Sequence, residues 1–314
     1  MELRRLGATD LRIAPLVLGG NVFGWTADRT ASFAVLDAFV DGGGTMIDTA
    51  DVYSAWVPGH AGGESEALIG EWLRRSGKRD RVQIATKVGM LPGEGGAKLA
   101  PARIAAACDA SLARIGVERI DLYYAHQDDA SVPQEAALEA FGRLADAGKI
   151  HVLGASNFTA ARLKSANDAA AAGGLPRYHV LQPEYNLVRR DRYEGELENY
   201  CIEHNIGVLP YYALASGFLT GKYRSADDLG QSVRGGRMAE LVKSGAPVLA
   251  AMDAIAAETG ATLAQIALAW LMAQPGVTAP IASATSVTQL TELLGAWELE
   301  LTTEQLDRLT AAGA

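Results

Sequence analysis

Met46-Ile-Asp-Thr-Ala-Asp-Val-Tyr53 is a short apolar run that ends in an acid and is followed by a tyrosine. Two later segments have the same form. Val82-Gln-Ile-Ala-Thr-Lys87 ends in a lysine, and Ile120-Asp-Leu-Tyr-Tyr-Ala-His126 ends in a histidine. Short apolar runs of this kind are typical of buried β-strands. Because parallel strands point their carboxyl ends the same way, we expect the acid, the tyrosine, the lysine and the histidine to converge on one cleft.

Apolar runs alternate with helical patterns along the whole chain. Strands are expected at residues 16–19, 46–48, 82–86, 120–125, 151–155, 180–182, 207–211 and 277–281. Helices are expected at residues 30–41 and 65–75, from 101 onward, at 133–147, 159–172 and 192–204, within 247–274, and at 286–296. Eight strand–helix units predict an α/β fold, a (β/α)8 TIM barrel. The chain has no G-x-G-x-x-G motif, which disfavours a Rossmann domain.

Two segments lie outside these units. Residues 3–6 and 11–13 are expected to form an N-terminal β-hairpin that plugs the bottom of the barrel, and residues 302–312 an extra C-terminal helix with Thr302 or Thr303 as N-cap. No linker or change in composition divides the chain, so residues 1–314 are expected to form a single domain.

The composition narrows the class of protein. The chain has 314 residues, of which 49% are hydrophobic and 21% charged, enough for a large core. A net charge of −9 with no Lys/Arg-rich block disfavours a nucleic-acid partner. No run approaches a membrane span and no signal segment is present, so we expect a cytoplasmic protein with no membrane partner. Cys108 and Cys201 are expected to be buried free thiols.

The residues at the strand ends suggest acid catalysis on a carbonyl. A tyrosine hydroxyl has an ordinary pKa of about 10, and a nearby ammonium such as Lys87 is expected to lower the pKa of Tyr53. Asp48 would hold the lysine and keep it protonated, while His126 could donate to the same oxygen or orient a carbonyl. Each residue alone has a simpler interpretation, such as a capping Asp, a half-buried Tyr or a surface Lys. Their coincidence at three adjacent strand ends favours a proton donor for a carbonyl that receives a hydride.

These segments resemble those of the aldo-keto reductases, especially the branch that includes potassium-channel beta-subunit-like reductases. Gly154-Ala-Ser-Asn-Phe158, Leu181-Gln-Pro-Glu-Tyr-Asn186 and Leu209-Pro-Tyr-Tyr-Ala-Leu-Ala-Ser-Gly-Phe-Leu-Thr-Gly-Lys-Tyr223 extend the resemblance over nearly the whole chain, in order. The resemblance implies a barrel that binds a nicotinamide cofactor in extended form without a Rossmann fold. It implies NAD(P)-dependent reduction of an aldehyde or ketone, or the reverse oxidation of an alcohol or sugar.

The resemblance also assigns roles. Tyr53 would be the general acid, tuned by Lys87 and Asp48, and His126 would polarise the substrate carbonyl. The expected cofactor contacts are Gly20, Asn21, Ser156, Asn157, Gln182, Tyr211, Tyr212, Leu214, Ser216, Gly217, Leu219, Gly221, Lys222, Arg234, Ser283, Ser286, Gln289 and Glu292. In that set the carboxamide would be held by Ser156, Asn157 and Gln182, the ring by Tyr211, and the pyrophosphate by residues 214–222. Trp25 and Trp56 follow the first two strands and are expected to line the substrate mouth.

One segment departs from the family pattern. Many members have a lysine or arginine after the eighth strand that binds the 2′-phosphate of NADPH, but Ile281-Ala-Ser-Ala-Thr-Ser-Val-Thr-Gln-Leu290 has none. Hydroxyls at the start of the next helix could still favour an anion, without the stronger charge-assisted contacts. NADPH is therefore the expected cofactor, with NADH or dual specificity left open.

Other types of site fit the sequence less well than a carbonyl-reducing one. Gly217-Phe-Leu-Thr-Gly-Lys222 is one residue short of a P-loop, and Tyr223 replaces its Ser or Thr. A zinc site is disfavoured because His151 begins a strand, at the opposite end from His126, so no metal is expected. A Schiff-base lyase would need an uncharged lysine, which Asp48 opposes. A cofactor-sensing regulatory subunit with slow residual reductase activity remains the alternative function.

Overall fold

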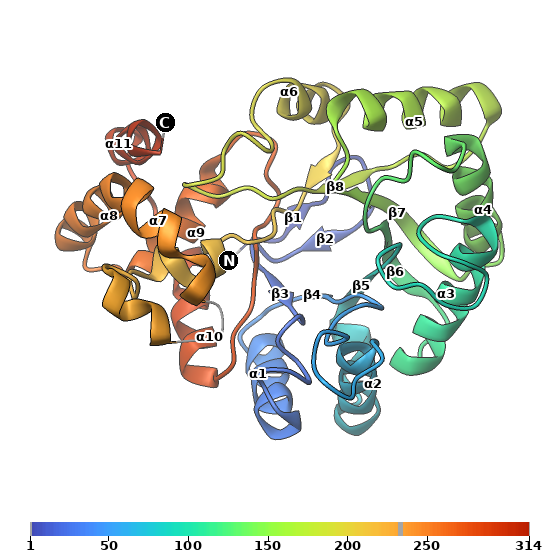
Figure 1. Cartoon of the computed structure of the whole chain (residues 1–314), viewed down its shortest axis with the longest axis horizontal. Coiled ribbons are helices and arrows are strands. Elements are labelled where there is room, and N and C mark those ends of the chain that lie inside the picture. Colours follow the sequence, from blue (N-terminus) through green and yellow to red (C-terminus); the bar gives the residue numbers. More distant parts are fainter. Residues whose placement is uncertain (1, 232–234, 314) are drawn as a thin grey trace.

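The computed structural model describes residues 2–231 and 235–313. Eight parallel strands form one sheet in the order β10-β3-β4-β5-β6-β7-β8-β9. A parallel bridge joins Val208 of β9 to Val277, just before β10, and the Thr278 N–H donates to the Val208 carbonyl at 2.9 Å. The sheet thereby closes into the (β/α)8 barrel that the alternation predicts, with the helices outside it (Figure 1).

The elements follow one another as the alternation requires. The barrel strands are β3 (Val17–Gly19), β4 (Met46–Asp48), β5 (Gln83–Val88), β6 (Ile120–Ala125), β7 (Ile150–Ser156), β8 (Val180–Gln182), β9 (Gly207–Val208) and β10 (Ile281–Ala282). The helices are α1 (Arg29–Asp41), α2 (Glu64–Ser76), α3 (Pro101–Ile115), α4 (Gln134–Asp146), α5 (Ala160–Gly173), α6 (Glu196–Glu203), α7 (Ala239–Ser244), α8 (Ala246–Thr259), α9 (Leu263–Ala273), α10 (Val287–Leu294) and α11 (Thr303–Ala312). A 3-10 segment, η2 (Ala215–Thr220), lies in the loop after β9.

Three predicted boundaries are wrong, each for a local reason. The strands predicted at 207–211 and 277–281 shorten to β9 and β10, because Pro210 and Pro280 have no N–H to donate. The helix predicted at 192–204 begins only at Glu196, because Gly195 before it has φ 93°, outside the helical region.

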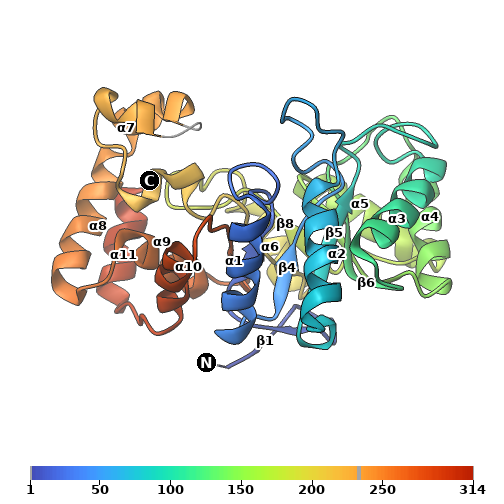
Figure 2. The same cartoon turned by 90° about the horizontal axis from the view of Figure 1, so that it is seen from below.

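The interior of the barrel is a small apolar core that includes the hairpin. Strands β1 (Arg4–Arg5) and β2 (Arg12–Ile13) pair antiparallel, as predicted. Leu6, Leu11 and Ile13 belong to the buried cluster inside the barrel. Figure 2 shows β1 at one end of the barrel and the loops after β4 and β5 at the other. The hairpin therefore closes the bottom, and the carboxyl ends of the strands face the opposite end.

The alternation of side chains along the strands explains which residues reach that end. Met46, Ala85 and Val180 point into the interior cluster. Because side chains on a strand repeat every second residue, the next inward positions are Asp48, Lys87 and Gln182. These three polar side chains therefore form a layer directly above the apolar core, and two of them, Asp48 and Lys87, are residues that the strand pattern alone predicted there.

Two further expectations concern cysteines and membranes. Cys108 and Cys201 are both buried and free, as predicted. Within residues 2–231 and 235–313, no single helix has the length and apolar character needed to cross a membrane; α8 and α9 meet that test only as a pair bent by 99°.

Candidate functional site

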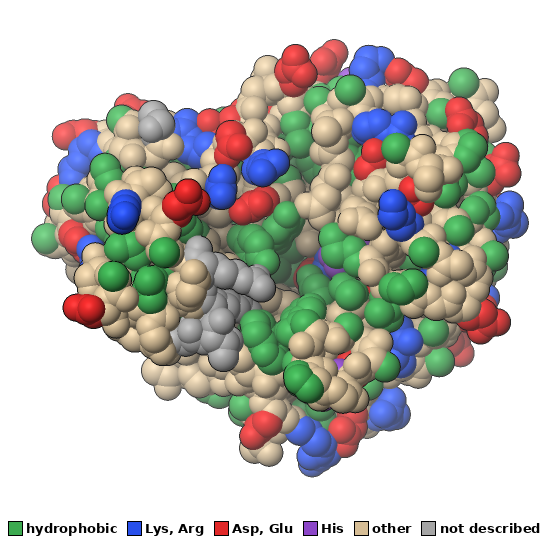
Figure 3. All heavy atoms as spheres, in the orientation of Figure 1, with side chains coloured by type: hydrophobic (Ala, Val, Ile, Leu, Met, Phe, Trp, Pro, Cys, Tyr) green, Lys and Arg blue, Asp and Glu red, His purple; other side chains and the backbone are tan. Residues whose placement is uncertain are grey.

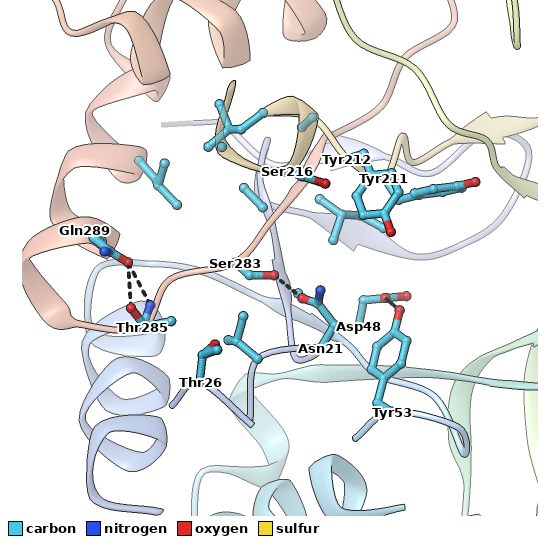
Figure 4. Close-up of a pocket in the computed structure, with 18 of the residues that line it drawn as sticks. Asn21, Thr26, Asp48, Tyr53, Tyr211, Tyr212, Ser216, Ser283, Thr285 and Gln289 are labelled. Carbon is cyan, nitrogen blue, oxygen red and sulfur yellow. Dashed lines mark hydrogen bonds between the residues drawn. The ribbon is translucent and has the colours of Figure 1, made fainter. Parts of the chain in front are cut away.

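A cavity of about 740 Å³ opens at the carboxyl ends of the strands. Figure 3 shows hydrophobic side chains gathered around this hollow near the centre of one face. Figure 4 shows Tyr53 and Asp48 at one end of the cavity and Thr285 and Gln289 at the other, with Tyr211, Tyr212 and Ser216 along one side. An elongated cavity of this size suits an extended ligand with a reacting end and a remote end.

Lys87 is the centre of the reacting end. Its side chain is fully buried, and its Nζ donates to Asp48 Oδ2 at 2.6 Å, to the Thr49 carbonyl at 2.7 Å and to the Tyr53 hydroxyl at 2.9 Å. An ammonium has three N–H donors, so each one has an acceptor. The Tyr53 oxygen accepts from the ammonium, and its own hydrogen is held only by a long bond of 3.5 Å to Asp48 Oδ2, so a closer acceptor could take it. A Schiff-base role for Lys87 would require breaking all three bonds.

The pKa of Tyr53 differs from the sequence-based expectation. Burial, followed by the negative charge of Asp48, raises the pKa of this phenol well above its usual range. Burial also lowers the pKa of Lys87, although Asp48 opposes this effect. The expected lowering by the ammonium is therefore outweighed by desolvation and by the carboxylate 3.5 Å away. Tyr53 remains protonated at neutral pH, as a proton donor must.

His126 faces Tyr53 across the reacting end. The two rings lie edge to face with centroids 6.1 Å apart. Burial and the charge of Lys87 lower the pKa of His126 well below its usual range, so the imidazole is neutral at pH 7. Asn157 Nδ2 donates to the His126 carbonyl at 2.9 Å and fixes the backbone of this strand end. A neutral imidazole beside a phenol can donate to a carbonyl oxygen without adding charge.

A polar group of side chains continues from Asp48 along the cavity. Gln182 Nε2 donates to Asp48 Oδ1 at 2.8 Å, and Ser156 Oγ donates to the Gln182 carbonyl at 2.8 Å. Asn157, at φ 57°, accepts from the Tyr211 hydroxyl at 2.8 Å. With its amide nitrogen occupied, Gln182 keeps its Oε1 as an acceptor for an amide or hydroxyl ligand.

The middle of the cavity is bordered by the backbone of the loop after β9. Ala215, Ser216 and Gly217 have φ values of 47°, 56° and 96°. A Cβ at Gly217 would lie 3.0 Å from Lys222 Nζ, so the glycine lets the lysine lie close against the loop. In the described lining, Lys222 is the one Lys or Arg. The exposed backbone and the ammonium suit an anionic group such as a pyrophosphate.

The remote end is polar but carries no positive charge in the part of its lining that the structure describes. Gln289 Oε1 accepts from the Thr285 N–H at 2.9 Å and hydroxyl at 3.0 Å, and Glu292 adds a carboxylate. The Ser283 hydroxyl donates to Asn21 Oδ1 at 2.5 Å. The hydroxyl donors of Ser283 and Thr285 are therefore used within the protein. Arg234, the predicted basic contact, lies outside the described residues.

The mouth beside Tyr53 is apolar. Trp56, Met90 and Tyr212 line it with exposed fractions of 48%, 39% and 43%. Trp25 was also predicted to line the mouth, but it does not line the cavity. Its ring packs edge-on against Trp56, with 5.5 Å between the ring centroids. Trp25 therefore supports Trp56 from behind, whereas Asn21, Val22 and Thr26 of the same loop line the cavity.

Most predicted cofactor contacts line the cavity, but four do not. The exceptions are Gly20, Leu219, Gly221 and Ser286. The Gly20 N–H donates to the Asp48 carbonyl and Leu219 is fully buried in the outer core. Gly221 ends η2 at φ 78°, and the Ser286 side chain caps α10. All four shape the loops around the cavity.

Other lining residues were not among the predicted site residues. They are Gly19, Val22, Thr26, Val52, Met90, Ala213, Thr220, Gln231, Ala264, Ile281, Ala282, Thr285 and Leu293. Most are small or apolar, and their position follows from loop paths. Only Thr285 had a signal, as a hydroxyl near the start of a predicted helix.

His126, Asp128, Asp129 and His151, which could be thought of as zinc ligands from their residue types, do not form a metal site. His151 Nε2 bonds Asp10 at 2.8 Å, and Asp128 pairs with Arg162 at 2.7 Å. Among the described residues, no group of three His, Cys, Asp or Glu side chains could hold a metal ion.

Comparisons with known proteins agree on one family for this chain. A model of the Aldo/keto reductase family matches residues 15–314. The uncharacterized oxidoreductase YrpG of Bacillus subtilis is 32% identical over 98% of this chain and 95% of its own length. Norsolorinic acid reductase B of Aspergillus parasiticus is 30% identical over 97% of this chain and 82% of its own. A probable voltage-gated potassium channel subunit beta of Arabidopsis thaliana is 32% identical over 93% of this chain and 90% of its own length.

Proposed function

Because this chain belongs to the aldo/keto reductase family, we propose that it is a nicotinamide-dependent oxidoreductase that reduces an aldehyde or ketone, with Tyr53 as general acid. The observation that carries the proposal is the set of three bonds from Lys87 to Asp48, Thr49 and Tyr53. They hold the Tyr53 hydroxyl, which itself donates only a long bond of 3.5 Å to Asp48, at the inner end of a cavity. Steady-state consumption of NADPH or NADH with a panel of aldehydes and ketones tests it.

The residues of the chain would act on the substrate carbonyl in a fixed order. The neutral His126 would orient the carbonyl oxygen toward Tyr53, and the phenol would donate its proton as negative charge develops on that oxygen. Lys87 would then stabilise the phenolate that remains, at 2.9 Å from the oxygen. A reduced nicotinamide, when bound, supplies the hydride to the carbonyl carbon. The reverse sequence would oxidise an alcohol.

The cavity fits such a cofactor along its whole length. Gln182, Ser156 and Asn157 offer amide and hydroxyl groups near the reacting end, and Tyr211 offers an aromatic face. Lys222 beside the side-chain-free Gly217 would meet the pyrophosphate. The remote end would take the adenosine, with Gln289 and Glu292 as its polar neighbours.

We expect the dissociation constants of NADPH and NADH to differ by less than roughly tenfold. The described lining of the remote end has no cation for a charge-assisted bond to the 2′-phosphate. Titration with each cofactor, followed by tryptophan fluorescence, measures the ratio, since Trp56 lines the cavity. A preference for NADPH above about a hundredfold that Arg234→Gln removes would contradict this expectation and assign the selectivity to that residue.

Replacing Trp56 with Ala is expected to raise KM for an aromatic aldehyde roughly tenfold with kcat within a few-fold of the parent. Trp56 is half-exposed and stacks edge-on to the Tyr53 ring at 6.2 Å between centroids, so it contributes binding surface but no proton. Initial rates against substrate concentration separate the two constants. A fall in kcat with unchanged KM would instead place Trp56 in the chemistry.

A binding or regulatory role is the second candidate. The similarity to plant proteins described as probable channel beta subunits favours it. Such a protein would bind cofactor in the titration above and turn over slowly on every carbonyl tested. Turnover faster than about 1 per second on any substrate would favour the enzyme, since typical kcat values begin there.

A further inference from the structure

Asp51 is the acid near the reacting end that the proposed chemistry does not use. Its side chain is fully buried. Arg103 Nη2 donates to its Oδ2 at 3.3 Å, while its Oδ1 has no hydrogen-bond partner among the described residues. Glu66, the neighbouring acid, accepts from Thr86 at 2.6 Å and from Arg114 at 2.7 Å. A buried carboxylate with a single long bond is costly and calls for an explanation.

Asp51 lies between the catalytic segment and a loop of the substrate mouth. Its N–H donates to the Lys87 carbonyl at 3.3 Å, and it is two residues from Tyr53. On the other side, Arg103 of α3 donates from Nε to the Leu91 carbonyl at 3.1 Å and from Nη1 to the Glu94 carbonyl at 3.4 Å. One guanidinium thus joins Asp51 to the loop that follows β5.

The packing of this loop depends on that guanidinium. A Cβ on Gly93 would lie 2.6 Å from Arg103 Nη1, so the backbone lies directly on the side chain. A Cβ on Gly62, in the loop after β4, would lie 2.8 Å from the Asp51 carbonyl and 2.9 Å from Leu91. The loop begins next to Met90, which lines the cavity. The two loops of the mouth therefore meet over Asp51 and Arg103.

The surroundings of Asp51 make the charge of its carboxyl group depend on pH near neutrality. Burial and the carboxylate of Glu66 raise the pKa of Asp51 to about 7, against the opposing effect of Arg103 and Arg114. The remaining ionisable neighbours are Lys87 of β5 and Tyr123 of β6. A carboxyl with this pKa is mostly charged at pH 8 and mostly neutral at pH 6. Only the charged form makes an ion pair with Arg103, whose guanidinium stays charged at both pH values.

We propose that Asp51 and Arg103 are a positioning pair, which holds residues 90–100 of the substrate mouth against the catalytic segment and releases them when Asp51 takes up a proton. The inference rests on the proposed function only for its effect on catalysis. The release itself is a property of the protein alone. With the loop released, the wall that contains Met90 is less ordered and substrate binds more weakly, while the phenol and Lys87 stay in place.

Hydrogen exchange of the loop amides tests the pair without substrate or cofactor. Gly93, Gly96 and Ala100 have N–H bonds within the loop, to Gly96, Gly93 and Ala97. After correction for intrinsic rates, we expect these amides to exchange roughly tenfold more slowly at pH 8 than at pH 6 in the parent protein. Asp51→Asn should exchange fast at both pH values, because Asn imitates the neutral acid.

A matched control is available at the other end of the barrel. Asp121 is also a buried carboxylate paired with an arginine, Arg79, at 2.8 Å. Asp121→Asn should keep the parent pattern in residues 93–100. Arg103→Lys should exchange fast at both pH values, because an ammonium lacks the fork that spans three acceptors. With an aromatic aldehyde it should raise KM roughly tenfold with kcat within a few-fold.

The outcomes separate this inference from the proposed function. Equal loop exchange in the parent, Asp51→Asn and Asp121→Asn at both pH values would overturn the positioning pair even in an active reductase. The expected exchange pattern in a protein that reduces no carbonyl would support the pair and refute the reductase. A loss of kcat with unchanged KM in Arg103→Lys would also overturn the pair, since it would place Arg103 in the chemistry.

Discussion

Replacing Tyr53 with Phe is expected to lower kcat roughly a thousandfold and to leave cofactor binding within a few-fold of the parent. The substitution removes one oxygen, which accepts from Lys87 at 2.9 Å and donates only a long bond of 3.5 Å to Asp48, and with it the proton that the proposed reaction transfers. Neutral His126 has no second proton to give in its place at neutral pH, because burial lowers the pKa of this imidazole.

The measurement pairs single-turnover rates with cofactor titration by fluorescence. Tyr193→Phe is the matched control, because it removes a buried tyrosine hydroxyl that has no partner among the described residues and does not line the cavity. It should keep parent turnover. If Tyr53→Phe retained turnover within a few-fold of the parent, Tyr53 would not be the general acid and another donor would have to be sought.

Strand periodicity explains why the reacting end could be located from the sequence. Asp48, Lys87 and Gln182 each lie two residues beyond an apolar inward position, so the same alternation that buries Met46 and Ala85 places them at the cavity. Residues that directly follow a strand end, such as His126 after β6, are brought to the same end of the barrel. The sequence therefore contained enough local information to bring together Asp48 and Lys87, which are 39 residues apart, whereas Gln182 was placed at the site only by the family resemblance.

The loops were less predictable, for physical reasons. Whether Gly221 contacts a ligand or ends a helix depends on its φ of 78° and on the path of residues around it, not on its identity. The direction of the Tyr53 pKa depends on desolvation, which only the packed structure supplies. The link from Asp51 to Arg103 joins a loop to a helix, between residues 52 positions apart, with no repeated pattern to indicate it.

The second large effect is expected at Lys87. Its replacement should lower both stability and turnover, and a second substitution at Asp48 should restore only the stability. Lys87→Met removes a buried cation and leaves Asp48, which is 2% exposed, with Gln182 as its remaining close donor. Breaking a buried ion pair in this way costs about 3–5 kcal/mol of unfolding free energy. We also expect kcat to fall roughly a hundredfold to a thousandfold, because no ammonium remains to stabilise the tyrosine oxygen as its proton leaves.

The double variant Asp48→Asn/Lys87→Met distinguishes the two losses. With no unpaired charge left in the core, urea unfolding should recover most of the lost stability, as neutral replacements of buried pairs commonly do. Turnover should stay at the level of the single Lys87→Met variant, because the phenol still lacks its cationic partner. Recovery of turnover together with stability would mean that Lys87 acts only by keeping the site folded, and the role assigned to its bond with Tyr53 would be wrong.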